Sequence, residues 1–172
     1  MYAKWAKWQD VEAEVRFGKR MRRCPHVDGV VSCEREGDFA LLRYASAKVA
    51  PAPDARCVLE LLRDVKAAGW VLGDVAEEAF SGTKLRRVSR AVEVRRTYHE
   101  GWKSVEGDPP ERVAMSKGED YLEGMKGWET WDLYSVSAWL DHPLRAQCRS
   151  RQRPSVEECL AALNDDGGGG SV

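Results

Sequence analysis

The sequence has no long apolar run and almost no net charge, and each shortage excludes a class of protein. No stretch approaches the ~20 consecutive apolar residues that a membrane-spanning helix needs. The N-terminus, Met1 to Trp5, lacks the apolar core and cleavage site of a signal peptide, so we expect a cytoplasmic protein. The formal net charge of −1 gives no overall attraction to nucleic acid or to an anionic membrane, so an electrostatic partner has to meet a local patch.

Recognisable catalytic motifs are also missing. The chain contains no nucleophile elbow, no P-loop, no dinucleotide-binding glycine pattern and no H-E-x-x-H zinc motif. Three histidines, His26, His99 and His142, are the only histidine bases available near neutral pH, and no motif places a nucleophile beside them. We therefore expect a protein that is not an enzyme and that needs no cofactor.

Composition and length indicate one globular unit. The 172 residues fit a single domain, and a hydrophobic content of 43% with a charged content of 32% is ordinary for a folded protein. The end of the chain carries four consecutive glycines. We expect one domain over residues 1–164 and a flexible tail over residues 165–172.

The N-terminal part predicts a three-stranded antiparallel meander. Asp28-Gly29 provides the positive φ angles of a two-residue hairpin turn between residues 22–27 and 30–35, and residues 39–44 follow as a third strand. Before it, Val11–Phe17 alternates apolar and polar residues as a half-buried strand does. A longer helix that absorbs this stretch together with Trp5 is the competing interpretation.

Helices are predicted later in the chain. Asp54 is a candidate N-cap and Gly69 a candidate end for a helix with an apolar stripe. Ser155 and Glu158 have capping-box spacing at the start of a final helix. A short helix over residues 74–80 and a valine-rich strand over residues 84–98 are expected between them, while periodicity does not decide between helix and strand for residues 128–140. Together these elements predict an α+β fold, with a mainly antiparallel sheet packed against two or three helices.

One side-chain cluster follows from the predicted hairpin. Cys24, His26 and Cys33 would project from the same face of its two strands. Thiolate and imidazole are the ligands that zinc prefers, and a fourth ligand would come from elsewhere. The spacing matches no common zinc module, so the favoured interpretation is packed thiols, with a small zinc-binding domain as an alternative.

Arginine and lysine gather in local clusters. Arginine binds phosphate well, because its planar guanidinium donates two parallel hydrogen bonds. If the first cluster, within residues 16–23, and the second cluster, within residues 84–96, lie on neighbouring strands, they form a face that follows a phosphate backbone. The candidate nucleic-acid-binding residues are Arg20, Arg22, Arg23, Lys84, Arg86, Arg87, Arg90 and Arg96.

Aromatic residues gather in an acidic stretch near the C-terminus. The candidates are Trp128, Trp131, Tyr134 and Trp139. Aromatic anchors with a charged rim are typical of a protein-binding surface, although a core element is the more frequent explanation. The leading hypothesis is a non-enzymatic binding protein that occupies a surface of nucleic acid or of a nucleoprotein complex. The alternative is a protein-binding inhibitor or adaptor, for example a phage-type inhibitor of a host defence complex.

Overall fold

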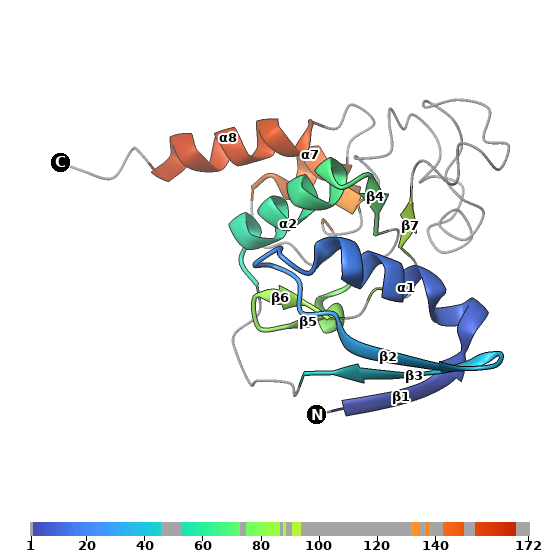
Figure 1. Ribbon diagram of the computed structural model, residues 1–172. Coiled ribbons are helices and arrows are strands. Elements are labelled where there is room, and N and C mark those ends of the chain that lie inside the picture. The colour runs from blue at the N-terminus through green and yellow to red at the C-terminus, as the bar shows by residue number, and fades with distance from the viewer. Residues whose placement is uncertain are drawn as a thin grey trace, which may run out of the picture.

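The computed structural model describes residues 2–45, 53–72, 75–86, 88, 91–93, 132–134, 137, 143–149 and 154–167 (Figure 1). The fold is α+β. Its strands are β1 (Tyr2–Lys7), β2 (Val30–Glu36), β3 (Phe39–Tyr44), β4 (Trp70–Val71), β5 (Phe80–Ser81), β6 (Lys84–Leu85) and β7 (Val92–Glu93). Its helices are α1 (Trp8–Met21), α2 (Ala55–Ala67), the 3₁₀ turn η1 (Glu77–Ala79), α7 (Arg145–Arg149) and α8 (Val156–Gly167).

The largest sheet is antiparallel and has the strand order β1-β3-β2. β2 and β3 form a hairpin whose turn contains Gly37, with a φ of 58°. Glycine adopts this left-handed conformation without the steric cost that a side chain adds. β3 is the central strand because β1, the first segment of the chain, pairs along its other side with Trp5 opposite Leu41.

The predicted N-terminal meander is wrong in its first strand. Residues 22–27 form no strand, and Asp28-Gly29 is not a hairpin turn, because α1 continues to Met21 and the chain then needs these residues to return to the sheet. Val27 instead makes a parallel bridge to Leu85. The second predicted hairpin, between the strands around Val30–Glu36 and Phe39–Tyr44, is confirmed.

The predicted strand over Val11–Phe17 is also wrong. The competing helical interpretation is confirmed for this stretch, but Trp5 lies in β1 and not in the helix. Val11–Phe17 forms the middle of α1, which is buried on two sides. Val11 and Val15 face the sheet, while Phe17 and Met21 belong to the second core. A helix with two buried faces carries apolar residues at nearly every second position, and this imitates the alternation of a strand.

The predicted helix after Asp54 is confirmed as α2. The Cys57 backbone N–H donates to Asp54 Oδ1 at 2.8 Å, which caps the first turn. Gly69, with a φ of 80°, ends the helix, and the chain turns directly into the buried Trp70. The apolar stripe of α2 is buried as expected: Val58, Leu61, Leu62 and Val65.

The C-terminal helix is confirmed as α8. Its capping box is reciprocal, since Glu158 N donates to Ser155 Oγ and Ser155 N donates to Glu158 Oε2, both at 3.1 Å. Helix α8 continues to Gly167, which lies beyond the predicted domain end at residue 164.

The central segments differ from the prediction in two ways. Residues 84–98 do not form one strand, because β6 turns back to pair with β5 and β7 pairs with β4 in a separate sheet. The short helix expected over residues 74–80 is limited to the 3₁₀ turn η1. The pairing of Trp70 with Glu93 joins residues far apart in the sequence, which local propensity does not encode. By contrast, β5 and β6 are adjacent strands joined by a turn that contains Gly82, with a φ of 63°.

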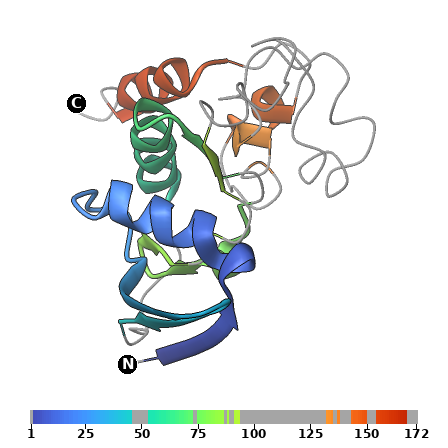
Figure 2. The ribbon, with the colours of Figure 1, turned by 45° about the vertical axis from the view of Figure 1, so that its right-hand side comes forward.

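The elements are stacked so that α1 lies between the large sheet and the other helices. Figures 1 and 2 show the sheet on one side of α1 and helices α2 and α8 on the other. A small core holds Val11 and Val15 against Ala40 and Leu42, and a larger core surrounds α2. The Phe17 ring meets the Trp70 ring edge to face at 5.5 Å in the larger core. Among the described helices, none combines the length and apolar character that crossing a membrane requires.

Candidate nucleic-acid interface

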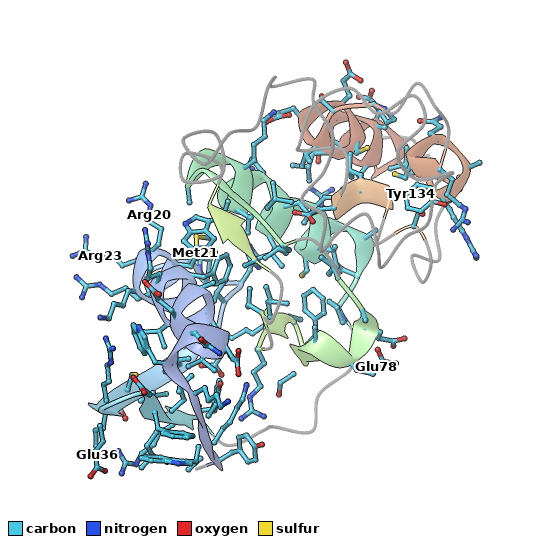
Figure 3. The ribbon with its side chains drawn as sticks, turned by 90° about the vertical axis from the view of Figure 1, so that its right-hand side faces the viewer. Arg20, Met21, Arg23, Glu36, Glu78 and Tyr134 are labelled. Carbon is cyan, nitrogen blue, oxygen red and sulfur yellow. The ribbon has the colours of Figure 1, made fainter. Side chains whose placement is uncertain are left out.

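The C-terminal end of α1 and the residues after it form a basic surface, which we call the basic end. Five of the eight residues from Arg16 to Arg23 are arginine or lysine, and none is acidic. The side chains of Lys19, Arg20, Arg22 and Arg23 are exposed. Figure 3 shows Arg20 and Arg23 pointing away from the body of the protein. Within the part of the chain that the structure describes, these four cations form no ion pair.

The polarity of α1 explains why a folded protein tolerates this concentration of charge. Asp10, Glu12 and Glu14 lie in the N-terminal half of the helix, whereas the cations lie at its C-terminal end. The helix macrodipole favours this distribution by about 0.3–1 kcal/mol for each well-placed charge. The distribution stabilises α1 and also leaves one end of it strongly positive.

The second predicted cluster is only partly available to a ligand. Lys84 is exposed on β6, but the guanidinium of Arg86 donates to the carbonyl of Ala45 and is half-buried. Leu85 connects β6 to the chain just beyond the basic end, because its N–H donates to His26 O at 2.8 Å and its carbonyl accepts from Asp28 N at 2.9 Å. The remaining candidates of this cluster, Arg87, Arg90 and Arg96, lie outside the described residues.

A cavity of about 240 Å³ lies between α1 and β2, beside the basic end. Its apolar lining comes from Trp8, Val15, Val30 and Val31. Its polar lining comes from Lys19, Ser32, Cys33 and Arg35, so the described lining contains two cations and no acid. The guanidinium of Arg35 lies 4.7 Å from the centre of the Trp8 ring, in cation–π contact.

Sequence reasoning missed this cavity because it depends on α1 being a helix. As a helix, residues 8, 15 and 19 share one face, which is opposite β2. The chain enters β2 close to α1, since a Cβ added at Gly29 would lie 3.6 Å from the Cα of Gly18, which is an ordinary van der Waals contact. The feature of the sequence that could have predicted the cavity is the helical spacing of Trp8, Val15 and Lys19.

The outer face of the large sheet carries an exposed aromatic pair. Trp5 on β1 and Phe39 on β3 stack with ring centroids 5.9 Å apart and nearly parallel planes. Their exposed fractions are 54% and 40%, which is high for side chains of this size. Charges of both signs surround the pair: Lys7 on β1 and the Arg43–Glu34 ion pair between β3 and β2.

The three predicted metal ligands are not brought together, which corrects the sequence-based cluster. Cys24 packs against the larger core and donates to Asp64 Oδ2 at 3.5 Å, and His26 Nε2 lies 3.3 Å from Glu60 Oε2. Cys33 instead packs against the small core on β2. The predicted convergence required a hairpin at Asp28-Gly29, which does not form.

Two further observations describe the chemistry of these thiols. Burial raises the pKa of the Cys24 thiol, and the neighbouring Asp64 carboxylate adds to this effect. Across the described residues, no group of three or more His, Cys, Asp and Glu is arranged to hold a metal ion.

The predicted protein-binding segment is only partly described. Trp128, Trp131 and Trp139 lie outside the described residues. Tyr134 is half-buried, and the Arg149 guanidinium from α7 lies 5.2 Å from its ring centre. Tyr134 belongs to a short helical stretch over residues 132–134. In this stretch Leu133 is fully buried, and Asp132 Oδ2 accepts a hydrogen bond from the Leu72 backbone N–H at 2.9 Å. The described part of this segment is therefore a core element.

Comparison with known proteins adds no functional assignment. No family model matches the chain, and no curated protein is significantly similar to it.

Proposed function

We propose that the protein is a non-enzymatic nucleic-acid-binding protein that contacts phosphates through the basic end of α1. The observation that carries the proposal is the group of four exposed cations, Lys19, Arg20, Arg22 and Arg23, without an ion pair among the described residues. Side chains of this kind neutralise phosphates and release bound counterions, which is the main source of sequence-independent affinity for nucleic acid.

The charge distribution favours a local contact over a general attraction. The whole chain has a formal charge of −1, so its acidic regions repel a polyanion while the basic end attracts it. A bound nucleic acid therefore has one preferred orientation, with its backbone along the exposed side of the basic end. Lys84 is exposed on β6, whose Leu85 is hydrogen-bonded to the segment that follows α1.

The test is a binding titration of short DNA and RNA across salt concentrations, with the wild type and the double variant Arg20→Glu/Arg23→Glu. We expect affinity that falls steeply with salt for the wild type. If both arginines contact phosphates, the variant reduces the slope of log K against log salt by about 1.4 for a single strand and about 1.8 for a duplex.

A matched control separates local contact from net charge. Arg145→Glu/Arg149→Glu changes the net charge equally, at two exposed positions of α7. Figures 2 and 3 show α7 on the opposite side of the molecule from the C-terminal end of α1. The control variant should keep most of the wild-type affinity and salt slope. Equal losses in both double variants, or no binding at low salt, would contradict the proposal.

A second candidate function is protein binding through the outer face of the large sheet. The exposed Trp5–Phe39 stack supports it, because aromatic anchors within a polar rim are typical of protein interfaces. The rim carries both Lys7 and Glu34, and this mixture suits a protein partner better than a polyanion. A photo-cross-linker at position 5 should capture one defined protein in cells, and Phe39→Arg should abolish that capture. Unchanged capture with Phe39→Arg would reject this candidate.

A further inference from the structure

We infer that the cavity between α1 and β2 accepts one unpaired base of a single-stranded nucleic acid. The inference rests on the proposed function, and it adds a preference for single strands and a residue-level site. The cavity is separate from the basic end except at Lys19, which belongs to both.

The lining of the cavity matches the chemistry of a nucleotide. A base is a flat apolar ring, and the valine and tryptophan side chains offer it an apolar surface. A phosphate is anionic, and Lys19 and Arg35 provide cations in the same lining, without a carboxylate to repel it. A guanidinium stacks well on bases, and the Arg35 guanidinium lies 4.7 Å from the centre of the Trp8 ring.

The size of the cavity limits how much of a ligand it holds. Pockets that enclose drug-sized molecules have volumes of about 300–1,000 Å³. At about 240 Å³, this cavity has room for one ring system rather than for two stacked bases. Bases in a duplex are paired and stacked, so a cavity of this kind takes a base only from a single strand or from an extruded position.

The cavity is open on the side from which a strand would approach. β2 is an edge strand, and Val31 at its irregular start is 59% exposed. A backbone held at Lys19 and Arg20 can therefore place its next base over β2 without a rearrangement of the sheet. Val31 is at once part of the lining and accessible from solvent.

The experiment compares labelled oligo(dT) with a duplex of the same length, for the wild type and for Val31→Glu. We expect the wild type to bind oligo(dT) more tightly than the duplex. Stacking one base contributes an amount that corresponds to about 5- to 150-fold in affinity, so Val31→Glu should lower the ratio of single-strand to duplex affinity within that range. Ala3→Glu, an exposed site on the other edge of the sheet, adds the same charge and should leave the ratio unchanged.

A chemical footprint provides a second readout that does not depend on a variant. Cys33 lines the cavity and Cys57 lies outside its lining, on α2, so the two thiols serve as probe and internal reference. Oligo(dT) should slow alkylation of Cys33, measured by mass spectrometry, and leave Cys57 unchanged. The duplex should protect neither thiol.

The outcomes distinguish the inference from the function on which it rests. Salt-dependent binding with equal affinities for single strand and duplex, and with Cys33 unprotected, overturns the inference and leaves the proposed function intact. No binding of either nucleic acid at low salt overturns both. Protection of Cys33 by poly-glutamate as strong as that by oligo(dT) also overturns the inference, and identifies the cavity as a site for acidic peptides.

Discussion

The contact between Tyr44 and Glu14 gives the sharpest test of how α1 is held on the sheet. The Tyr44 hydroxyl donates to Glu14 Oε1 at 2.7 Å, and both residues are buried, Glu14 with 7% of its surface exposed. Lys4 Nζ lies 3.6 Å from the other carboxylate oxygen. One carboxylate on α1 is thus held by a side chain from β3 and another from β1.

We expect Tyr44→Phe to lower the free energy of unfolding by about 1.5–3 kcal/mol. This is the usual contribution of a hydrogen bond to a charged group, and here its loss leaves one oxygen of a buried carboxylate without its partner. The ring and its packing against Ala40 and Leu42 remain. Urea unfolding at pH 7, followed by circular dichroism, measures the difference.

A double-mutant cycle with Glu14→Gln tests whether the loss arises from this pair. The coupling free energy should account for most of the effect of Tyr44→Phe. A stability of Tyr44→Phe within about 0.5 kcal/mol of the wild type, the range of an ordinary surface substitution, would refute the reasoning.

The same pair predicts an alkaline loss of stability. Burial raises the pKa of Tyr44 above its ordinary value of 10.0, and the hydrogen bond to the Glu14 carboxylate raises it further. Since the folded-state pKa is raised, this contribution is fully present below pH 10 and is lost as the pH rises through the folded-state value. A single group of this kind changes the free energy of unfolding by at most about 1.4 kcal/mol per pH unit, and Tyr44→Phe should lack that component.

Two further predictions concern α2 and the C-terminal thiols. Asp54→Ala should destabilise the protein by about 1 kcal/mol at pH 7, because it removes the N-cap of α2. Hydrogen bonds from Cys57 hold the pKa of Asp54 below its ordinary 3.8. The difference in unfolding free energy between wild type and Asp54→Ala should therefore disappear as the pH falls through the pKa of Asp54 in the folded protein. A difference in urea unfolding that does not change with pH would contradict this. Cys148 and Cys159 are fully buried, and their hydrogen bond together with burial raises the pKa of the Cys159 thiol, so both should react with a thiol reagent only after unfolding. Rapid labelling of either in the native protein would show that α7 and α8 open there.

The features that sequence analysis predicted correctly are those encoded within a few residues. The cap at Asp54, the turn at Gly69 and the capping box of Ser155 and Glu158 each depend on neighbours three or four positions away. A side chain that caps its own helix does so in any tertiary context. For this reason α2 and α8 appear where the sequence places them.

The N-terminal region was harder to predict because two local signals competed with long-range packing. Asp28-Gly29 favours a hairpin turn, but a strand over residues 22–27 would have to begin at Arg22, the C-cap of α1, with no residues left to reverse the chain. Burying α1 on both sides stabilises the helix as far as Met21. The residues between Met21 and Val30 then connect α1 to β2 and are not available as a strand. The cavity, the Trp5–Phe39 pair and the separation of Cys24 from Cys33 all follow from that single outcome.

The position of α1 also connects stability to the proposed function. Its N-terminal half is acidic and anchored to the sheet through Glu14, while its C-terminal half is basic and exposes Lys19 and Arg20. A substitution that loosens Glu14 would shift the helix against β2 and so alter the cavity, whereas charge reversal at Arg20 would leave the packing intact. Weakened binding of single strands in Tyr44→Phe, with duplex affinity retained, would therefore show that the cavity and not only the basic end contributes to recognition.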